Sequence, residues 1–305
     1  MFRDIVSNEE AKSFLQRELS YNRKSGTYLF YGEDRELQMR FALALAKGLN
    51  CENMENDFCG TCETCKRIDH LTHGDLDIIE DPNGVKIDQV RKMIYEASTT
   101  SYEGGKKVFI IKDIDKMKKE ASNGLLKIIE EPKDGTFFIM LSNSLNLLGT
   151  IKSRSIILPI NKQKPEDLNI NEEEYKFFLG RAIEIEKYLE ISNEKYLKEP
   201  LSYETIGENI KKYISTGEFK YKINVYKAIR DFVKNRKYID KIDRMFFCDE
   251  ILRGGGDRNF IKEIIAYSIE LLKCPEKMED FLILKGLQRY PINIKNLLIT
   301  FFVKD

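Results

Sequence analysis

The feature that most constrains the fold is an alternation of strand-like and helical segments between residues 26 and 160. Two of the strand-like segments contain runs that are apolar throughout, as expected for strands covered on both faces. Such alternation predicts a parallel sheet wrapped by helices. The predicted strands are 27–31, 76–80, 108–113, 136–142 and 155–160, and the predicted helices between them are 37–49, 87–98 and 120–131.

The sequence pattern changes after residue 160. A polar stretch containing Pro165 indicates a linker or domain boundary, and from about Glu172 onward the periodicity is almost entirely helical. The 305 residues exceed one ordinary domain. We therefore expect an α/β domain followed by helical domains.

Composition excludes several classes of protein. Lys+Arg and Asp+Glu both number 50, so no net charge attracts the chain to DNA or to a membrane surface. A stand-alone zinc-dependent nucleic-acid binder would normally be more basic. No apolar run approaches the ~18 residues of a membrane span, and the first residues contain no apolar signal core. We predict a cytoplasmic protein without a membrane partner, in which the six cysteines are not disulfide-bonded.

The first strand and helix flank a stretch that resembles a damaged phosphate-binding loop. A working loop reads G-x-x-x-x-G-K-[ST], and aligning Gly32 with its first glycine places Leu37, Gln38 and Met39 at the Gly, Lys and Ser/Thr positions. Gln38 carries no charge for phosphate, and Met39 offers Mg²⁺ no oxygen. Asp34 and its acidic neighbours place negative charge where a triphosphate would sit. The alternative is an ordinary strand-to-helix turn that never bound a nucleotide.

Four cysteines fall within a short span. Cys51, Cys59, Cys62 and Cys65 include a C-x2-C-x2-C pattern, and four thiolates suit tetrahedral Zn²⁺. Three alternatives remain: an iron–sulfur site, although the usual closing Cys-Pro is absent; a redox pair, which leaves two cysteines unexplained; and replacement of Cys51 by one of the two histidines, at positions 70 and 73. Cys248 and Cys274 are expected in helical cores.

Several motifs in order carry a family resemblance. Besides the loop and the cysteines, they are KIDQVRKMI (86–94), VFIIKDIDKM (108–117), NGLLKIIEEP (123–132) and LSNSLNLLGTIKSRS (141–155). Together they resemble the delta-prime subunits of the bacterial DNA polymerase III clamp loader, which belong to the AAA+ superfamily. The resemblance covers roughly residues 1–160, with a weak match at 291–298.

The resemblance implies the architecture and the partners. The expected fold is an AAA+ parallel-sheet module at 1–161 with a zinc knuckle at 51–65, then a small helical lid at 162–200 and an all-α collar at 201–305. The expected function is that of a non-ATPase subunit, without bound ATP, of a DNA-directed DNA polymerase holoenzyme. It would join ATPase and delta subunits in a five-membered ring that loads the sliding clamp onto primed DNA. The alternative is an ATP-hydrolysing clamp-loader motor with a divergent loop.

The resemblance also assigns one residue to chemistry. The family's Ser-Arg-Cys motif corresponds to Ser153, Arg154 and Ser155, so the arginine is kept and the cysteine is replaced by serine. Arg154 is then expected to act as an arginine finger that reaches the γ-phosphate of a neighbouring ATPase. Taken alone, the Ser-Arg pair is more typical of an arginine at an ordinary loop–strand junction that pairs with a surface acid.

Overall fold

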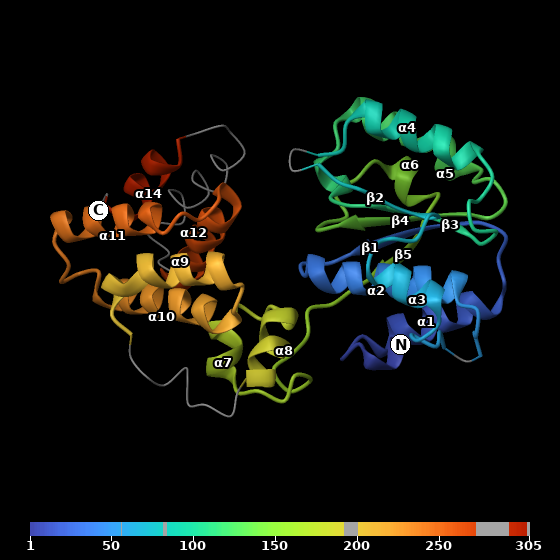
Figure 1. Cartoon of the computed structure of the whole chain (residues 1–305). Helices are drawn as coiled ribbons and strands as arrows, with labels where there is room; N and C mark the ends of the chain where they lie inside the picture. Colours follow the sequence, from blue (N-terminus) through green and yellow to red (C-terminus); the bar gives the residue numbers. More distant parts are fainter. Residues whose placement is uncertain (56, 82–83, 192–200, 273–292, 304–305) are drawn as a thin grey trace. The chain divides into compact units, whose positions relative to one another are not determined.

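The computed structural model describes residues 1–55, 57–81, 84–191, 201–272 and 293–303 (Figure 1). The chain divides into two compact units, Met1–Asn169 with Gly180–Ile183, and Ile170–Leu179 with Glu184–Asp305. The predicted lid ends at residue 200 and the predicted collar begins at 201; residues 192–200 lie outside the described residues, so this division stays a prediction. Within the described ranges, no helix combines the length and apolar character needed to cross a membrane.

The first unit is built on a parallel sheet with strand order β2-β3-β4-β1-β5. All five predicted strands are confirmed to within two residues at each end. β3 ends before the predicted limit because Asp113 adopts a left-handed conformation with φ 51° and starts the turn η2 (Ile114–Lys116). The strands are β1 (Gly26–Tyr31), β2 (Leu76–Ile79), β3 (Lys107–Ile111), β4 (Thr136–Ser142) and β5 (Ile156–Pro159).

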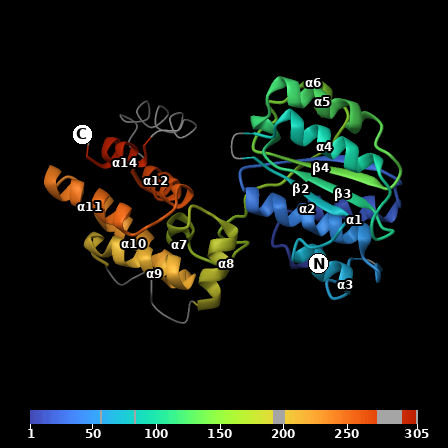
Figure 2. The same ribbon diagram turned by 45° about the horizontal axis from the view of Figure 1, so that its top comes forward.

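Helices cover both faces of this sheet (Figures 1 and 2). Successive strand residues point to opposite faces, so Tyr28 and Phe30 join one buried cluster with α1, α2 and α3, whereas Leu29 joins another with α4, α5 and α6. This two-sided burial explains the apolar strands. The helices are α1 (Glu9–Ser20), α2 (Arg35–Asn50), α3 (Glu63–Asp69), α4 (Ile87–Ser98), α5 (Lys119–Glu130) and α6 (Gly149–Lys152), preceded by the turn η1 (Phe2–Asp4).

The parallel arrangement gathers the ends of the strands at one edge of the sheet. β1 lies between β4 and β5, and the chain leaves β1 through the turn into α2. Residues that follow β1, β3 and β4 therefore come together near the start of α2. In sheets of this kind, ligands bind in the crevice outside the carboxyl ends of the strands.

The second unit is helical in its described part, as the periodicity predicted. Aromatic pairs fill its core: Tyr226 and Tyr267 stack with ring centroids 4.2 Å apart, and Phe232 and Phe247 with centroids 3.9 Å apart. Cys248 is buried as expected, and Cys274 lies outside the described residues. The elements are α7 (Glu172–Phe177), α8 (Ala182–Ile191), η3 (Tyr203–Thr205), α9 (Ile206–Thr216), α10 (Phe219–Asn235), α11 (Lys241–Arg253), α12 (Arg258–Leu272) and α14 (Ile294–Phe302).

Candidate functional site

The turn between β1 and α2 packs tightly against main chain from two other strands. The N–H of Gly32 donates to the carbonyl oxygen of Ser142, 3.1 Å away at the end of β4. A Cβ atom at Gly32 would lie 2.0 Å from the carbonyl oxygen of Ile160, just beyond β5. Such a contact is far inside van der Waals distance. Packing alone therefore requires a glycine at this position.

Gln38 occupies the position of the phosphate-loop lysine, but its side chain points into the protein. It is 1% exposed, and its Nε2 donates to the carbonyl oxygens of Gly32 at 2.7 Å and Ser142 at 3.2 Å. A lysine here would reach the β- and γ-phosphates. The Gln38 amide instead joins the first turn of α2 to the ends of β1 and β4, so it is a structural group.

The two neighbours of Gln38 also pack in or against the core. Leu37 is fully buried in the cluster between the sheet and α2, and Met39 packs against the same cluster. Neither side chain offers a polar atom suited to phosphate or Mg²⁺. All three replaced positions of the loop are thus used for packing.

Asp34 caps the helix that would otherwise receive phosphate. Its backbone is extended (φ −93°, ψ 97°), and its Oδ1 accepts from the N–H groups of Glu36 at 3.1 Å and Leu37 at 3.0 Å. Free N–H groups at a helix N-terminus bind anions. Here the chain's own carboxylate holds two of them. The sequence predicted only repulsion between Asp34 and phosphate. The cap was not predicted, although Asp directly before a helical pattern is a common capping signal.

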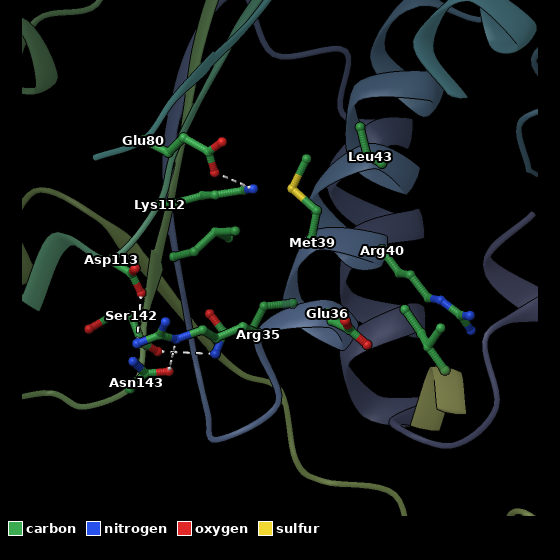
Figure 3. A pocket seen from close by; sticks show the side chains of 13 residues that line it. Arg35, Glu36, Met39, Arg40, Leu43, Glu80, Lys112, Asp113, Ser142 and Asn143 are labelled. Atoms are coloured by element: carbon green, nitrogen blue, oxygen red, sulfur yellow. Dashed lines mark hydrogen bonds and ion pairs between the residues drawn. The ribbon is translucent and has the colours of Figure 1, made fainter. Parts of the chain in front are cut away.

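A pocket at the carboxyl ends of β2, β3 and β4 is lined by charges that pair with one another (Figure 3). Arg35 approaches Asp113 at 3.1 Å and donates from Nε to Asn143 Oδ1 at 3.1 Å. On the other side, Lys112 Nζ lies 2.6 Å from a carboxylate oxygen of Glu80. The crevice where a nucleotide would be bound is therefore lined by residues that form internal ion pairs.

The two acids that follow β3 are likewise engaged. Asp113 accepts from Lys116 at 2.9 Å in addition to its contact with Arg35. Asp115 Oδ1 accepts from the Ser142 hydroxyl at 3.3 Å and from the Asn143 N–H at 3.2 Å. These carboxylates hold the ends of β3 and β4 together, which is a structural use of acids at a position where a nucleotide site holds Mg²⁺ and water.

Arg154 lies just beyond α6 and is bonded to the protein surface. Its Nη2 donates to Glu130 Oε1 at 2.6 Å and its Nη1 to the Thr150 carbonyl oxygen at 3.1 Å. The side chain is 30% exposed. The hydrogen bond and the charge of Arg154 lower the pKa of the Glu130 carboxyl below its ordinary value. The structure thus places Arg154 beside a surface acid, with part of its guanidinium open to solvent.

The serines on either side of Arg154 fix the path of the chain. The Ser153 hydroxyl donates to the Thr150 carbonyl oxygen at 3.2 Å, and the Ser155 hydroxyl donates to the Ile151 carbonyl oxygen at 2.7 Å. Both bonds tie the residues on either side of Arg154 back to carbonyl groups of α6. Ser155, where the resembling family has cysteine, therefore helps to hold the loop that carries Arg154.

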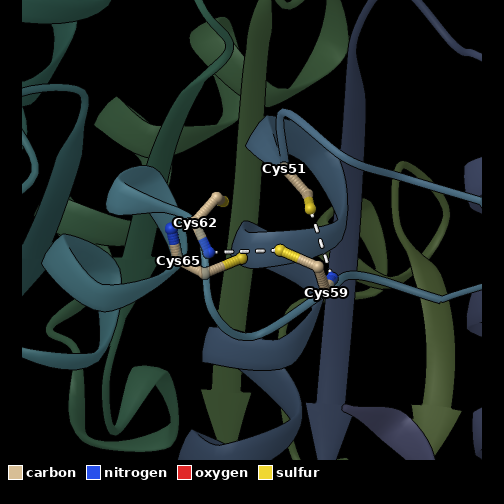
Figure 4. A group of neighbouring side chains, drawn as sticks. All are labelled: Cys51, Cys59, Cys62 and Cys65. Carbon is tan, nitrogen blue, oxygen red and sulfur yellow. Dashed lines mark hydrogen bonds between the residues drawn. The ribbon is translucent and has the colours of Figure 1, made fainter.

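The four clustered cysteines come together as their spacing predicted (Figure 4). The Sγ atoms of Cys51, Cys59, Cys62 and Cys65 all lie within 4.8 Å of one another. Several backbone N–H groups point at the sulfurs: Cys59 donates to Cys51 at 3.3 Å, Cys62 to Cys59 at 3.2 Å, and Cys65 to Cys62 at 3.4 Å. Such bonds favour thiolates, the form that binds metal. The cluster could hold a metal ion.

Local conformation explains how the short segment folds around this cluster. Gly60 has φ +71°, which permits the tight turn after Cys59, and Cys62 caps the N-terminus of α3. Hydrogen bonds from the N–H groups of Thr61 and Cys62 lower the pKa of the Cys59 thiol to about 6. Burial raises the pKa of the Cys65 thiol. The Cys59 thiol therefore ionises more readily than the Cys65 thiol.

The histidine at position 73, considered as a ligand in place of Cys51, takes part in a different network. His73 is buried; its Nδ1 accepts from the Asp75 N–H at 3.2 Å, and its Nε2 lies 3.4 Å from Glu103. Burial opposes ionisation of Glu103, but the Gly74 N–H at 2.6 Å, His73 and Arg67 outweigh it and hold the pKa of this carboxyl below its ordinary value. In the described part of the chain, the metal-like cluster is made of thiols alone.

Comparison with known proteins identifies the first unit. The family model described as "DNA polymerase III, delta subunit" matches residues 7–164, just over half of the chain. DNA polymerase III subunit delta′ of Bacillus subtilis is 35% identical over 155 residues, which cover 50% of this chain and 47% of that protein. The delta′ subunit of Pseudomonas aeruginosa is 32% identical over 134 residues, covering 42% and 41%.

Related subunits also match the same region. DNA polymerase III subunit tau of Escherichia coli is 31% identical over 157 residues, which cover 51% of this chain and 24% of that protein. The matched region thus spans less than half the length of these curated relatives.

A solved structure extends the likeness in fold over nearly the whole chain. A DNA polymerase III gamma subunit-related protein from Thermotoga maritima superimposes with a TM-score of 0.62 at 17% identity, covering 95% of this chain and 96% of that one. The fold is therefore that of an AAA+ module followed by a helical region. Together with the sequence matches, this makes the chain a member of the DNA polymerase III delta subunit family, resembling delta′ clamp-loader subunits.

Proposed function

We propose that this chain is a non-ATPase, delta′-type subunit of a cytoplasmic DNA polymerase III clamp loader. Its partners are ATPase and delta subunits in a five-membered ring that loads the sliding clamp onto primed DNA. The helical lid is assigned to 162–200 and the collar that joins the ring to 201–305. One observation carries the non-ATPase role: Asp34 and Gln38 fill, from within the chain, the places where phosphate and its lysine would lie.

The geometry opposes the alternative of an ATP-hydrolysing motor. That function needs Gln38 to reach phosphate, but its amide is buried and bonded to two carbonyl oxygens. It also needs a free carboxylate for Mg²⁺, whereas Asp113 and Asp115 bind Arg35, Lys116 and the end of β4. Binding ATP would break several internal bonds without supplying the missing lysine.

Calorimetric titration of the purified chain with ATP and Mg²⁺ tests the loss of the nucleotide site. We expect no heat of binding up to millimolar ATP. Micromolar binding would favour the motor instead. A Gln38→Lys variant serves as a control, because restoring the lysine alone leaves Asp34 on the helix N-terminus and should not restore affinity.

Arg154 is proposed to act in trans on the ATPase next to this subunit, with Ser153 supporting its loop. A fixed guanidinium stabilises the charge that develops on a transferred phosphoryl group. Exposed ion pairs such as that with Glu130 contribute little to stability. The more highly charged γ-phosphate can therefore take up the remaining donors of the guanidinium at small cost.

Zinc is proposed as the ion held by the four cysteines. Sulfurs bound tetrahedrally at about 2.3 Å from Zn²⁺ lie about 3.8 Å apart, a separation that falls inside the 4.8 Å within which the four Sγ atoms lie. Four protein ligands would leave no open position for water, so the zinc would be structural and would hold the 51–65 segment to α2 and α3. A thiol-only cluster with its N–H donors supports this choice.

The arginine-finger role is tested in the assembled clamp loader. An Arg154→Ala variant should assemble normally but slow the ATP turnover stimulated by clamp and primed DNA, because loss of an arginine finger costs about 10³-fold or more at the affected site. Arg91→Ala is a matched control, since Arg91 also pairs with a surface acid, Asp88, at 2.9 Å. Unchanged turnover with Arg154→Ala would remove the finger assignment.

A further inference from the structure

Glu130 occupies an unfavourable place for an acid. It is the last residue of α5, where the partial negative charge of the helix C-terminus disfavours a carboxylate. Its side chain is 54% exposed, so burial does not hold it there. Its bond to Arg154 Nη2, at 2.6 Å, is the feature that sets it apart from an ordinary surface acid. The stability of α5 therefore does not explain why an acidic residue stands at position 130.

The contacts of Arg154 leave part of its guanidinium for a ligand. A guanidinium has five N–H donors, and two of those on Arg154 are used, by Glu130 and by the Thr150 carbonyl oxygen. The Nε atom is buried without a partner among the described residues. One N–H remains on each terminal nitrogen. The side chain is thus held from one side, while donors suited to a second anion are kept.

We infer that Glu130 is a positioning residue for Arg154, an inference that rests on the proposed finger function. Arginine has a long side chain that samples many rotamers in water. A group fixed in its working orientation before it meets its target avoids the cost of being ordered at that moment. Glu130 and the Thr150 carbonyl provide this fixation from two elements, α5 and α6.

The contact geometry of Glu130 is that of a carboxylate that orients the Arg154 side chain, not of one that covers its guanidinium. Glu130 forms a single contact with one terminal nitrogen of Arg154, so it does not cover the guanidinium as a bidentate carboxylate would. An exposed pair of this kind contributes little to folding. Removing the Glu130 carboxylate should therefore leave the stability of the chain nearly unchanged and loosen the orientation of Arg154.

The test uses clamp loader assembled with Glu130→Ala, Arg154→Ala or both changes in this chain. We expect Glu130→Ala to lower the kcat of clamp- and DNA-stimulated ATP hydrolysis by about two- to tenfold, the cost of ordering one long side chain. The KM for ATP should not change. Glu130→Gln retains an acceptor oxygen and should restore part of the rate. Glu131→Ala, at the next exposed acid, is the matched control.

The double variant separates positioning from a general structural effect. If Glu130 acts through Arg154, adding Glu130→Ala to Arg154→Ala should cause no further loss. An equal loss in both backgrounds, or a rate raised by Glu130→Ala alone, would overturn the inference. If Arg154→Ala slows hydrolysis but Glu130→Ala does not, the positioning role fails while the finger stands. If Arg154→Ala has no effect, both assignments fail.

Discussion

Replacing Gln38 with methionine tests whether the lysine position of the loop has become structural. Methionine has nearly the volume of glutamine but no donor for the Gly32 and Ser142 carbonyl oxygens. We expect Gln38→Met to lower the free energy of unfolding of the first unit. If the side chain were a remnant of a nucleotide site without structural use, the substitution would have almost no effect.

The magnitude follows from the contacts. Each lost hydrogen bond contributes about 1 kcal/mol. The Ser142 carbonyl would still accept from the Gly32 N–H, whereas loss of the short 2.7 Å bond would remove the side-chain donor to the Gly32 carbonyl. A buried group that loses its partner adds a desolvation cost, and the similar volumes keep the packing term small. The expected total is about 2–3 kcal/mol.

Native-state hydrogen exchange followed by mass spectrometry is the suitable assay, because a chain with two units need not unfold in one step. Peptides covering β1 and α2 should lose protection equivalent to this free energy. Gln16→Met on α1 is the control, since the Gln16 side chain forms no hydrogen bond within the described residues. A loss below about 0.5 kcal/mol at β1 and α2, the size of ordinary surface effects, would refute the structural role of Gln38.

Three further outcomes are expected. Gly32→Ala should destabilise the first unit by about 1–3 kcal/mol in thermal unfolding, because its Cβ would meet the Ile160 carbonyl; unchanged stability would contradict the close packing. Metal analysis should find one zinc per chain, and Cys59→Ser should weaken zinc binding by more than about 100-fold; a metal-free chain with protected α3 amides would contradict a structural zinc. Because the folded pKa of Glu103 is depressed, its stabilising contribution is full above about pH 4.3, the ordinary value, and is lost as pH falls through the folded pKa. Acid titration should therefore show the stability advantage of wild type over Glu103→Gln shrinking below about pH 4.3, and a constant difference would contradict this assignment.

The fold of the first unit could largely be predicted because its strands are short apolar runs with clear ends. The bounds of β4 and α4 match the predicted ones at both ends. The order of the strands could not be obtained in this way. It depends on hydrogen bonds between distant residues, such as the pairing of Gly26 opposite Phe137, which no local pattern encodes. Helix α1 was not predicted, although Ala11 and Leu15 have the four-residue spacing of a buried helix face.

Site residues were predictable where chemistry depends on residue type and spacing, as for the four cysteines. The roles of Asp34 and Glu130 were not, because each depends on a conformation or a distant partner. Whether Asp34 repels phosphate or caps α2 is decided by its extended backbone and the direction of its side chain. Glu130 gains its role from an arginine 24 residues away in the chain.

The capping of α2 by Asp34 has a thermodynamic consequence. A phosphate loop that awaits its ligand gains order and stability when nucleotide binds, in proportion to the logarithm of ligand concentration. Here the anion is covalently part of the chain and always present at the helix N-terminus. The order of the β1–α2 turn therefore does not depend on a bound anion, so the stability of the first unit should stay the same at any nucleotide concentration.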